Sequence, residues 1–157
     1  MHSFNPFRRK LLLGAPALIL STRNVFASQS SPVIEIWKSP TCGCCQDWLN
    51  YMEKSGFTVG TIYPIGNAGA RKALGIPLKF GSCHTAKIKG YAIEGHVPAQ
   101  DVYRLLKEKP DAIGLTVPEM PIGSPGMDGP EYKGQKDRYQ VLLIQKDGSA
   151  TVYRQYN

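Results

Sequence analysis

Three cysteines crowd into four residues near the start of the chain, and this crowding constrains the fold more than any other feature. Cys42, Cys44 and Cys45 closely follow a β-branched and aromatic run, Val33–Trp37, which predicts a strand. Apolar residues then recur at helical spacing through residues 44–55. The cysteines therefore mark the junction between a strand and a helix.

The next part of the chain predicts alternating strands and helices. We expect strands at 57–63, 85–89 and 91–94, a short helix at 70–74, and an amphipathic helix from Pro98 to about Pro110. The resulting order is β-α-β-α-β-β-α, with the cysteine motif at the start of the first helix. This order resembles the thioredoxin-like fold, so we expect an α/β, three-layer thioredoxin-like fold with a mixed central sheet.

The C-terminal part has a different composition. Residues 114–138 are rich in proline and glycine and lack periodicity, which predicts a long functional or mobile loop. Residues 139–145 and 150–155 then predict a β-hairpin that turns at Asp147-Gly148. Because no internal repeat or domain boundary is visible, residues 28–157 are expected to form a single metal-binding domain.

The first 27 residues predict an export signal peptide. Basic residues 8–10 precede an apolar stretch at 11–20, and cleavage after Ala27 fits the small residues there. An apolar run of this length is shorter than the ~20 residues that span a bilayer. Arg8-Arg9 also fits a twin-arginine signal, and both export routes stay open. We expect a periplasmic protein with no stable membrane span after cleavage.

The formal net charge of +7 does not indicate a nucleic-acid-binding protein. Without residues 1–27, which carry four basic residues and no acidic one, 15 Lys and Arg face 12 Asp and Glu, a net charge of +3. No basic stripe with interleaved aromatic residues remains. Nucleic acid is therefore not expected as a partner.

The spacing of the cysteines favours a metal site over a disulfide framework. Four cysteines in an exported protein ordinarily suggest two disulfides, but neighbours such as Cys44 and Cys45 rarely reach disulfide geometry. At the start of a helix the free N–H groups and the dipole favour thiolate, and soft thiolate selects Cu(I), zinc or iron–sulfur clusters. Cys45 shares an apolar face with Trp48, so a core role stays open for it.

Further candidate ligands lie outside the first helix. In thioredoxin-like proteins the loop before the third strand faces the cysteine motif, which would bring Cys83 near Cys42. His84 is either a ligand or a structural histidine, and His96 comes just before the last helix. Met120 and Met127 bracket a Pro/Gly loop, where thioethers either bind Cu(I) or fill gaps under the loop.

Four motifs, in this order, resemble the CopG-type copper-resistance proteins, a family long catalogued as a domain of unknown function. They are Lys38–Cys45, Ser82–Thr85, Tyr91–Pro98 and Met120–Met127, and the resemblance runs from about Val33 to Tyr153. It implies a thioredoxin-like fold, a periplasmic location and copper bound by all four cysteines: Cys42, Cys44, Cys45 and Cys83. The same motifs contain the other candidate ligands: His84, His96, Met120 and Met127.

We therefore expect a periplasmic protein that holds Cu(I), as a polynuclear thiolate cluster, in copper resistance, with other periplasmic copper-handling proteins as partners. The alternative is a thiol-disulfide or copper-redox oxidoreductase that uses Cys42 and Cys45 as a Cys-x-x-Cys pair. Against it, Ser82–Thr85 lacks the proline usual beside such sites. A structural zinc site with three cysteines and His84 is a further alternative.

Overall fold

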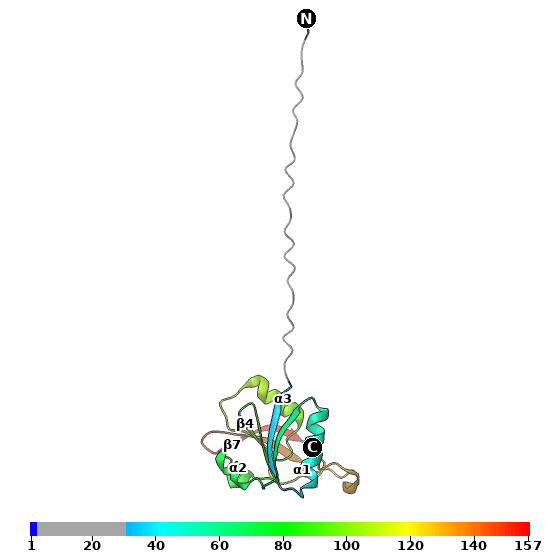
Figure 1. Cartoon of the computed structure of the whole chain (residues 1–157), viewed down its shortest axis with the longest axis vertical. Coiled ribbons are helices and arrows are strands. Elements are labelled where there is room, and N and C mark those ends of the chain that lie inside the picture. The colour runs from blue at the N-terminus through cyan, green and yellow to red at the C-terminus, as the bar shows by residue number, and fades with distance from the viewer. Residues whose placement is uncertain (3–30) are drawn as a thin grey trace.

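The computed structural model describes residues 31–157, together with Met1 and His2, and their strands form one mixed sheet (Figure 1). In chain order the strands are β1 (Val33–Lys38), β2 (Thr58–Tyr63), β3 (His84–Ile88), β4 (Tyr91–Glu94), β5 (Gly114–Thr116), β6 (Tyr139–Ile144) and β7 (Ala150–Tyr156). The helices are α1 (Gly43–Lys54), α2 (Ala68–Ala73) and α3 (Ala99–Glu108), with short 3₁₀ turns at Leu78–Phe80 and Pro130–Tyr132. The prediction of a mixed α/β fold is confirmed.

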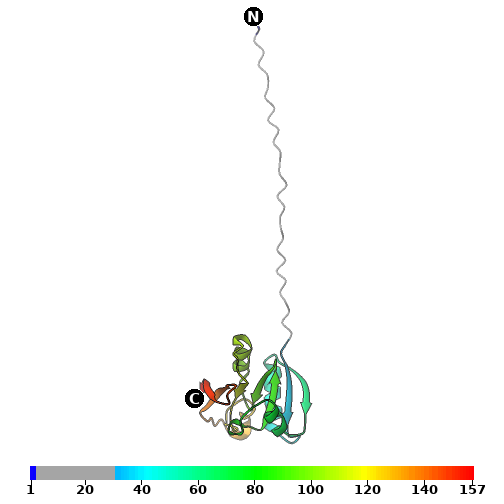
Figure 2. The same ribbon diagram turned by 90° about the vertical axis from the view of Figure 1, so that its left-hand side faces the viewer.

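The seven-stranded sheet runs in the order β2-β1-β3-β4-β5-β6-β7. Helix α1 connects β1 to β2, and these two strands pair in parallel. On its other side, β1 pairs antiparallel with β3. Strand β4 joins β3 antiparallel and β5 parallel, and the hairpin of β6 and β7 completes the sheet. Figure 2 shows this hairpin on the opposite side of the molecule from β1 and β2.

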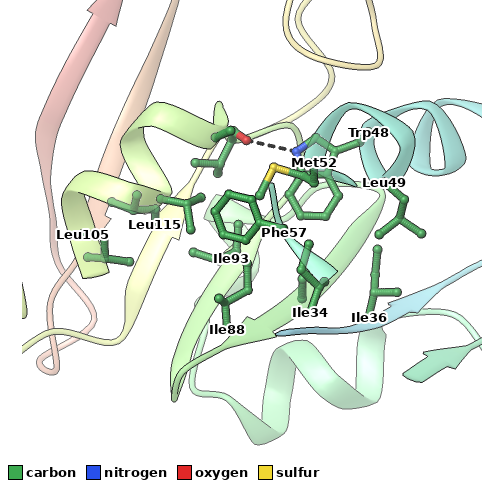
Figure 3. Close-up of a cluster of buried hydrophobic side chains, with 14 of the residues drawn as sticks. Ile34, Ile36, Trp48, Leu49, Met52, Phe57, Ile88, Ile93, Leu105 and Leu115 are labelled. Carbon is green, nitrogen blue, oxygen red and sulfur yellow. Dashed lines mark hydrogen bonds between the residues drawn. The ribbon is translucent and has the colours of Figure 1, made fainter. Parts of the chain in front are cut away.

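The main core lies where α1 and α3 pack against one face of the sheet (Figure 3). The predicted apolar face of α1 is confirmed, since Cys45, Trp48, Leu49 and Met52 are all buried. The Trp48 indole N–H donates to the Val97 carbonyl at 3.0 Å, just before α3. Because this donor is paired, the large aromatic ring is buried without leaving an unsatisfied N–H group. These contacts fix the first helix against the segment that carries His96.

A second, smaller cluster lies on the opposite face of the sheet. It joins Ile76, Ala92 and Ile144, with Leu74, Phe80 and Ile113 packed around them. Alternate strand residues point to opposite faces, so Ala92 reaches this cluster while its neighbour Ile93 enters the main core. Helical segments therefore cover both faces, as expected for three layers. The more specific thioredoxin-like assignment stays a prediction.

The predicted loop at residues 114–138 is wrong at its start, because residues 114–116 form β5 between β4 and β6. Three residues are too few to show an alternating pattern, and all three are buried whichever face of the sheet they point to. Gly114 permits the pairing, since a Cβ there would lie 1.7 Å from the Ala92 carbonyl oxygen. The predicted C-terminal hairpin is confirmed, with Gly148 at a φ of 80° in its turn.

The predicted export signal, apart from Met1 and His2, lies outside the described residues, and so does its cleavage site. Among the residues that the structure describes, no helix combines the length and apolar character needed to cross a membrane.

Replacing Gly114 by alanine should break the β4–β5 pairing. The new methyl group would overlap the Ala92 backbone, and we expect a loss of at least about 2 kcal/mol in the free energy of unfolding by urea. Gly69→Ala is the matched control, because Gly69 lies in α2 with nothing within 4 Å. It should leave stability unchanged or raise it by up to ~1 kcal/mol. Equal stability of the two variants would contradict this account of β5.

Candidate metal centre

The turn between β1 and α1 presents three cysteines at one helix end. Cys42 stands at the N-cap position in an extended conformation, and its N–H donates to the Ser39 carbonyl at 3.2 Å. Cys42 and Cys44 are half-buried, whereas Cys45 is fully buried beside the main core. The sulfurs therefore lie at the border between the core and the surface, where a metal ion can reach them.

Cys42 and Cys45 are joined by a disulfide, with their Cα atoms 5.4 Å apart. The expectation that crowding disfavours disulfides is wrong for this pair. The alternative prediction of an oxidoreductase had named Cys42 and Cys45 as its Cys-x-x-Cys pair. Residues three apart lie on the same side of one helical turn, so their side chains meet. The geometric objection applies only to the adjacent pair. Cys44 and Cys83 retain free thiols.

The fourth cysteine reaches the helix because β3 pairs with β1. In that register Lys38, the last residue of β1, lies opposite His84, the first residue of β3. The residue before His84 is therefore beside the turn that follows β1, and this residue is Cys83. Its sulfur lies 3.5 Å from the Cys45 sulfur and 4.0 Å from the Cys44 sulfur. All four cysteine sulfurs lie within 4.8 Å of one another.

Two histidines approach Cys83 from the other side. Its sulfur lies 3.3 Å from His84 Nδ1 and 3.1 Å from His96 Nε2. His96 Nδ1 lies 2.8 Å from the Pro125 carbonyl, which only accepts hydrogen bonds, so Nδ1 carries the proton. The Nε2 lone pair then faces Cys83, which is the arrangement of a metal-binding histidine. Cys83 thus belongs both to the sulfur group and to a Cys-His-His group.

Burial sets the protonation of these groups. It lowers the pKa of His84 well below the usual value, with His96 as a further cause, and it lowers the pKa of His96 too. Both rings are therefore neutral near pH 7, the form that binds metal. Burial and the nearby Cys44 raise the pKa of the Cys83 thiol to about 12. A metal ion must therefore displace a proton from Cys83 on binding.

His84 carries an unsatisfied nitrogen in the core. The ring is fully buried, packs at 4.6 Å from Trp48 between ring centroids, and meets His96 edge-on at 5.1 Å. Within the described part of the chain, its Nε2 has no hydrogen-bond partner. Buried polar atoms are seldom left unpaired, so such an atom calls for an explanation. The His84 atom that faces the Cys83 sulfur is Nδ1, so a metal ion bound beside the sulfurs would not by itself satisfy Nε2.

The Pro/Gly loop lies against the site through its backbone. The Pro125 carbonyl holds His96, and a Cβ at Gly126 would lie 2.7 Å from the Cys44 carbonyl oxygen. Met127 is buried and its sulfur accepts a hydrogen bond from the Tyr132 hydroxyl at 3.3 Å, whereas Met120 is 48% exposed. The roles of both methionines as ligands stay predictions. Pro125 could not be identified from the sequence, because it contributes only a backbone carbonyl.

Comparison with known proteins adds a family context. A family model described as "Protein of unknown function, DUF411" matches residues 80–127, which include Cys83 and both buried histidines. No curated protein matches the chain. Two solved structures of a copper resistance protein CopG, forms 2 and 1, are similar at 39% and 41% sequence identity, each with a TM-score of 0.71. The matches cover 81% and 79% of this chain, and 99% and 96% of the solved chains.

Proposed function

The chain belongs to the CopG family of copper resistance proteins, and on this basis we propose that it is a periplasmic protein that binds Cu(I). The observation that carries the proposal is the donor set around Cys83. Four sulfurs lie together, and two neutral imidazoles adjoin one of them. Thiolate and imidazole are ligands that suit copper, and soft thiolates favour Cu(I) over hard cations such as Mg²⁺ and Ca²⁺.

We further propose that several copper ions bind together. Cys83 lies in both groups of candidate ligands, which supports a thiolate shared between two ions. Four Cu⁺ ions and four thiolates would give a neutral core, which avoids the cost of burying net charge. Zinc is the alternative metal for the same donors.

The disulfide makes copper capacity depend on the redox state. With Cys42 and Cys45 joined, Cys44 and Cys83 are the cysteines left to supply thiolates. Reduction of the disulfide consumes two electrons and two protons and yields two thiols. All four sulfurs are then available, so the reduced protein is the form that holds a cluster.

The cellular setting follows from the N-terminus and the family. We propose that the signal sequence exports the protein and that the mature chain sequesters copper, or hands it to other periplasmic copper-handling proteins, during copper stress. A twin-arginine route would suit this role because it carries folded cargo, with copper already bound.

Titration with Cu(I) tests the proposal. Fully reduced, copper-free protein should bind more than one equivalent, and the disulfide form should bind fewer, as measured by competition with a coloured Cu(I) chelator. Cys83→Ser should reduce the number of ions bound, because it removes the sulfur shared by both groups. Thr41→Ser, at an exposed residue beside Cys42, is the control and should match wild type. Saturation of the reduced protein at one equivalent would contradict a cluster.

The disulfide also favours a second candidate function, thiol-disulfide exchange. The Cys83 sulfur lies 3.5 Å from the Cys45 sulfur. Attack by the Cys83 thiolate would form a Cys45–Cys83 bond, break the Cys42–Cys45 bond and release the Cys42 thiolate. Against this, a Cys83 pKa of about 12 leaves little thiolate near neutral pH.

An insulin-reduction assay separates the two candidates. If the protein is mainly a copper carrier, its turnover in the presence of a reductant should stay near the uncatalysed rate, because Ser82–Thr85 lacks the proline usual beside the active sites of such oxidoreductases. Sustained turnover that is lost in Cys42→Ser would instead establish the oxidoreductase.

A further inference from the structure

The residue before Cys83 is held from three directions by groups distant in sequence. The Ser82 N–H donates to Glu94 Oε1 at 2.7 Å. The Ser82 carbonyl accepts hydrogen bonds from Asn67 Nδ2, at 3.1 Å, and from the Arg71 guanidinium. The Ser82 hydroxyl donates to the Glu119 carbonyl. Both main-chain polar groups of Ser82 are thus bound by side chains rather than by a neighbouring strand.

Glu94 is the centre of this network. It ends β4, is fully buried, and pairs through Oε1 with Arg71 Nε at 2.8 Å. Its other oxygen accepts a hydrogen bond from the Thr85 hydroxyl. Burial raises the pKa of Glu94, and the contacts with Thr85, Ser82 and Arg71 oppose that rise. The carboxyl group therefore joins α2, β3 and β4 at one point.

The same short segment also carries one of the candidate ligands. Glu94 is followed by Gly95 and His96, and His96 Nε2 lies 3.1 Å from the Cys83 sulfur. Gly95 has a φ of 71°, and a Cβ there would lie 2.6 Å from the Ser82 Cβ, so the two segments touch closely. Glu94 therefore ties the backbone before Cys83 to the backbone that bears His96.

Buried ion pairs are weak evidence of a stabilising role, since an apolar replacement is often no less stable. This pair holds one side of Cys83, while His84 on the other side is fixed in the β1–β3 pairing. We propose that Glu94, held by Arg71, is a positioning residue that fixes Cys83 within reach of the other sulfurs and of His96. This role rests on the copper-binding function proposed above, because Glu94 and Arg71 would act on copper binding through the position of Cys83.

The chain offers a matched control in a second buried carboxylate. Asp101 on α3 is also fully buried, pairs with Arg154 Nε at 2.7 Å, and accepts a hydrogen bond from the Tyr156 hydroxyl at 2.6 Å. None of these partners is a cysteine or a histidine. Neutralising Asp101 therefore removes the charge of a buried carboxylate that faces an arginine, without touching the Cys83 segment.

The test compares Glu94→Gln with Asp101→Asn, two near-isosteric changes that remove one buried charge each. Cu(I) affinity is measured by competition with bathocuproine disulfonate. The rate at which iodoacetamide alkylates Cys83 is measured by mass spectrometry on reduced, copper-free protein. We expect Glu94→Gln to weaken Cu(I) binding about tenfold, the range seen for groups that orient metal ligands, and to speed Cys83 alkylation several-fold. Asp101→Asn should leave both within about twofold of wild type, even where it lowers stability equally.

Indistinguishable effects of the two variants on Cys83 alkylation and on Cu(I) affinity would overturn the positioning role. Asn67→Ala is the second variant, for the case in which Glu94→Gln does not fold. It removes the donor to the Ser82 carbonyl, the Thr85 hydroxyl and Glu94 Oε1, and it retains both partners of the Glu94–Arg71 pair. Asn67→Ala should also weaken Cu(I) binding and speed Cys83 alkylation, by smaller factors than Glu94→Gln. If neither quantity changes, the proposal is overturned.

Cu(I) affinity and the Cys83 alkylation rate distinguish failure of the proposed function from failure of the positioning role. Wild-type protein that binds no Cu(I) contradicts the proposed function. The alkylation rates, taken without copper, still decide whether Glu94 positions Cys83.

Discussion

The antiparallel register of β3 on β1 is the constraint on which the site depends. It places Lys38 opposite His84, so that the chain leaves β1 into the cysteine turn at the point where Cys83 enters β3. The pairing brings together sulfurs that are 38 and 39 residues apart along the chain. A slip of one residue would turn every side chain of β3 to the other face of the sheet and move Cys83 away from the helix.

Around this register the candidate ligands differ in their protonation and redox states. The two histidines are already neutral, and the Pro125 carbonyl orients His96 with its lone pair toward Cys83. Cys83 is protonated, and Cys42 and Cys45 are oxidised. Loading the proposed cluster would therefore require both loss of a proton from Cys83 and reduction of the disulfide. This dependence links copper binding to the pH and to the thiol redox state of the compartment.

Features set by local sequence were predictable, and those set by tertiary contacts were not. Composition and spacing predicted the β-branched strand β1, the apolar face of α1 and the turn at Gly148. Strand β5 was missed, because its three residues are held by β4 and β6 rather than by a pattern of their own. The first helical turn allowed the Cys42–Cys45 disulfide, which crowding in the sequence had argued against.

In the candidate site, too, some residues could be predicted from local sequence and others depend on tertiary contacts. Cys42, Cys44 and Cys45 could be found from spacing, and Cys83 from the expected topology. The burial of His96 and its hydrogen bond to Pro125, in contrast, depend on a loop 29 residues further on. Glu94 looked like an ordinary strand residue, since its partners come from α2, β3 and the Ser82 backbone. Residues that orient ligands through long-range contacts leave no local sequence signal.

In the proposed copper centre, Cys83 joins the cysteine motif to the two histidines. Copper-edge X-ray absorption, with metal content per chain, on protein purified from the periplasm of copper-stressed cells tests it most directly. We expect more than one copper per chain, Cu–S scattering, and short Cu–Cu distances from thiolates shared between ions. Copper-free protein with the Cys42–Cys45 disulfide intact would contradict the account and favour the oxidoreductase.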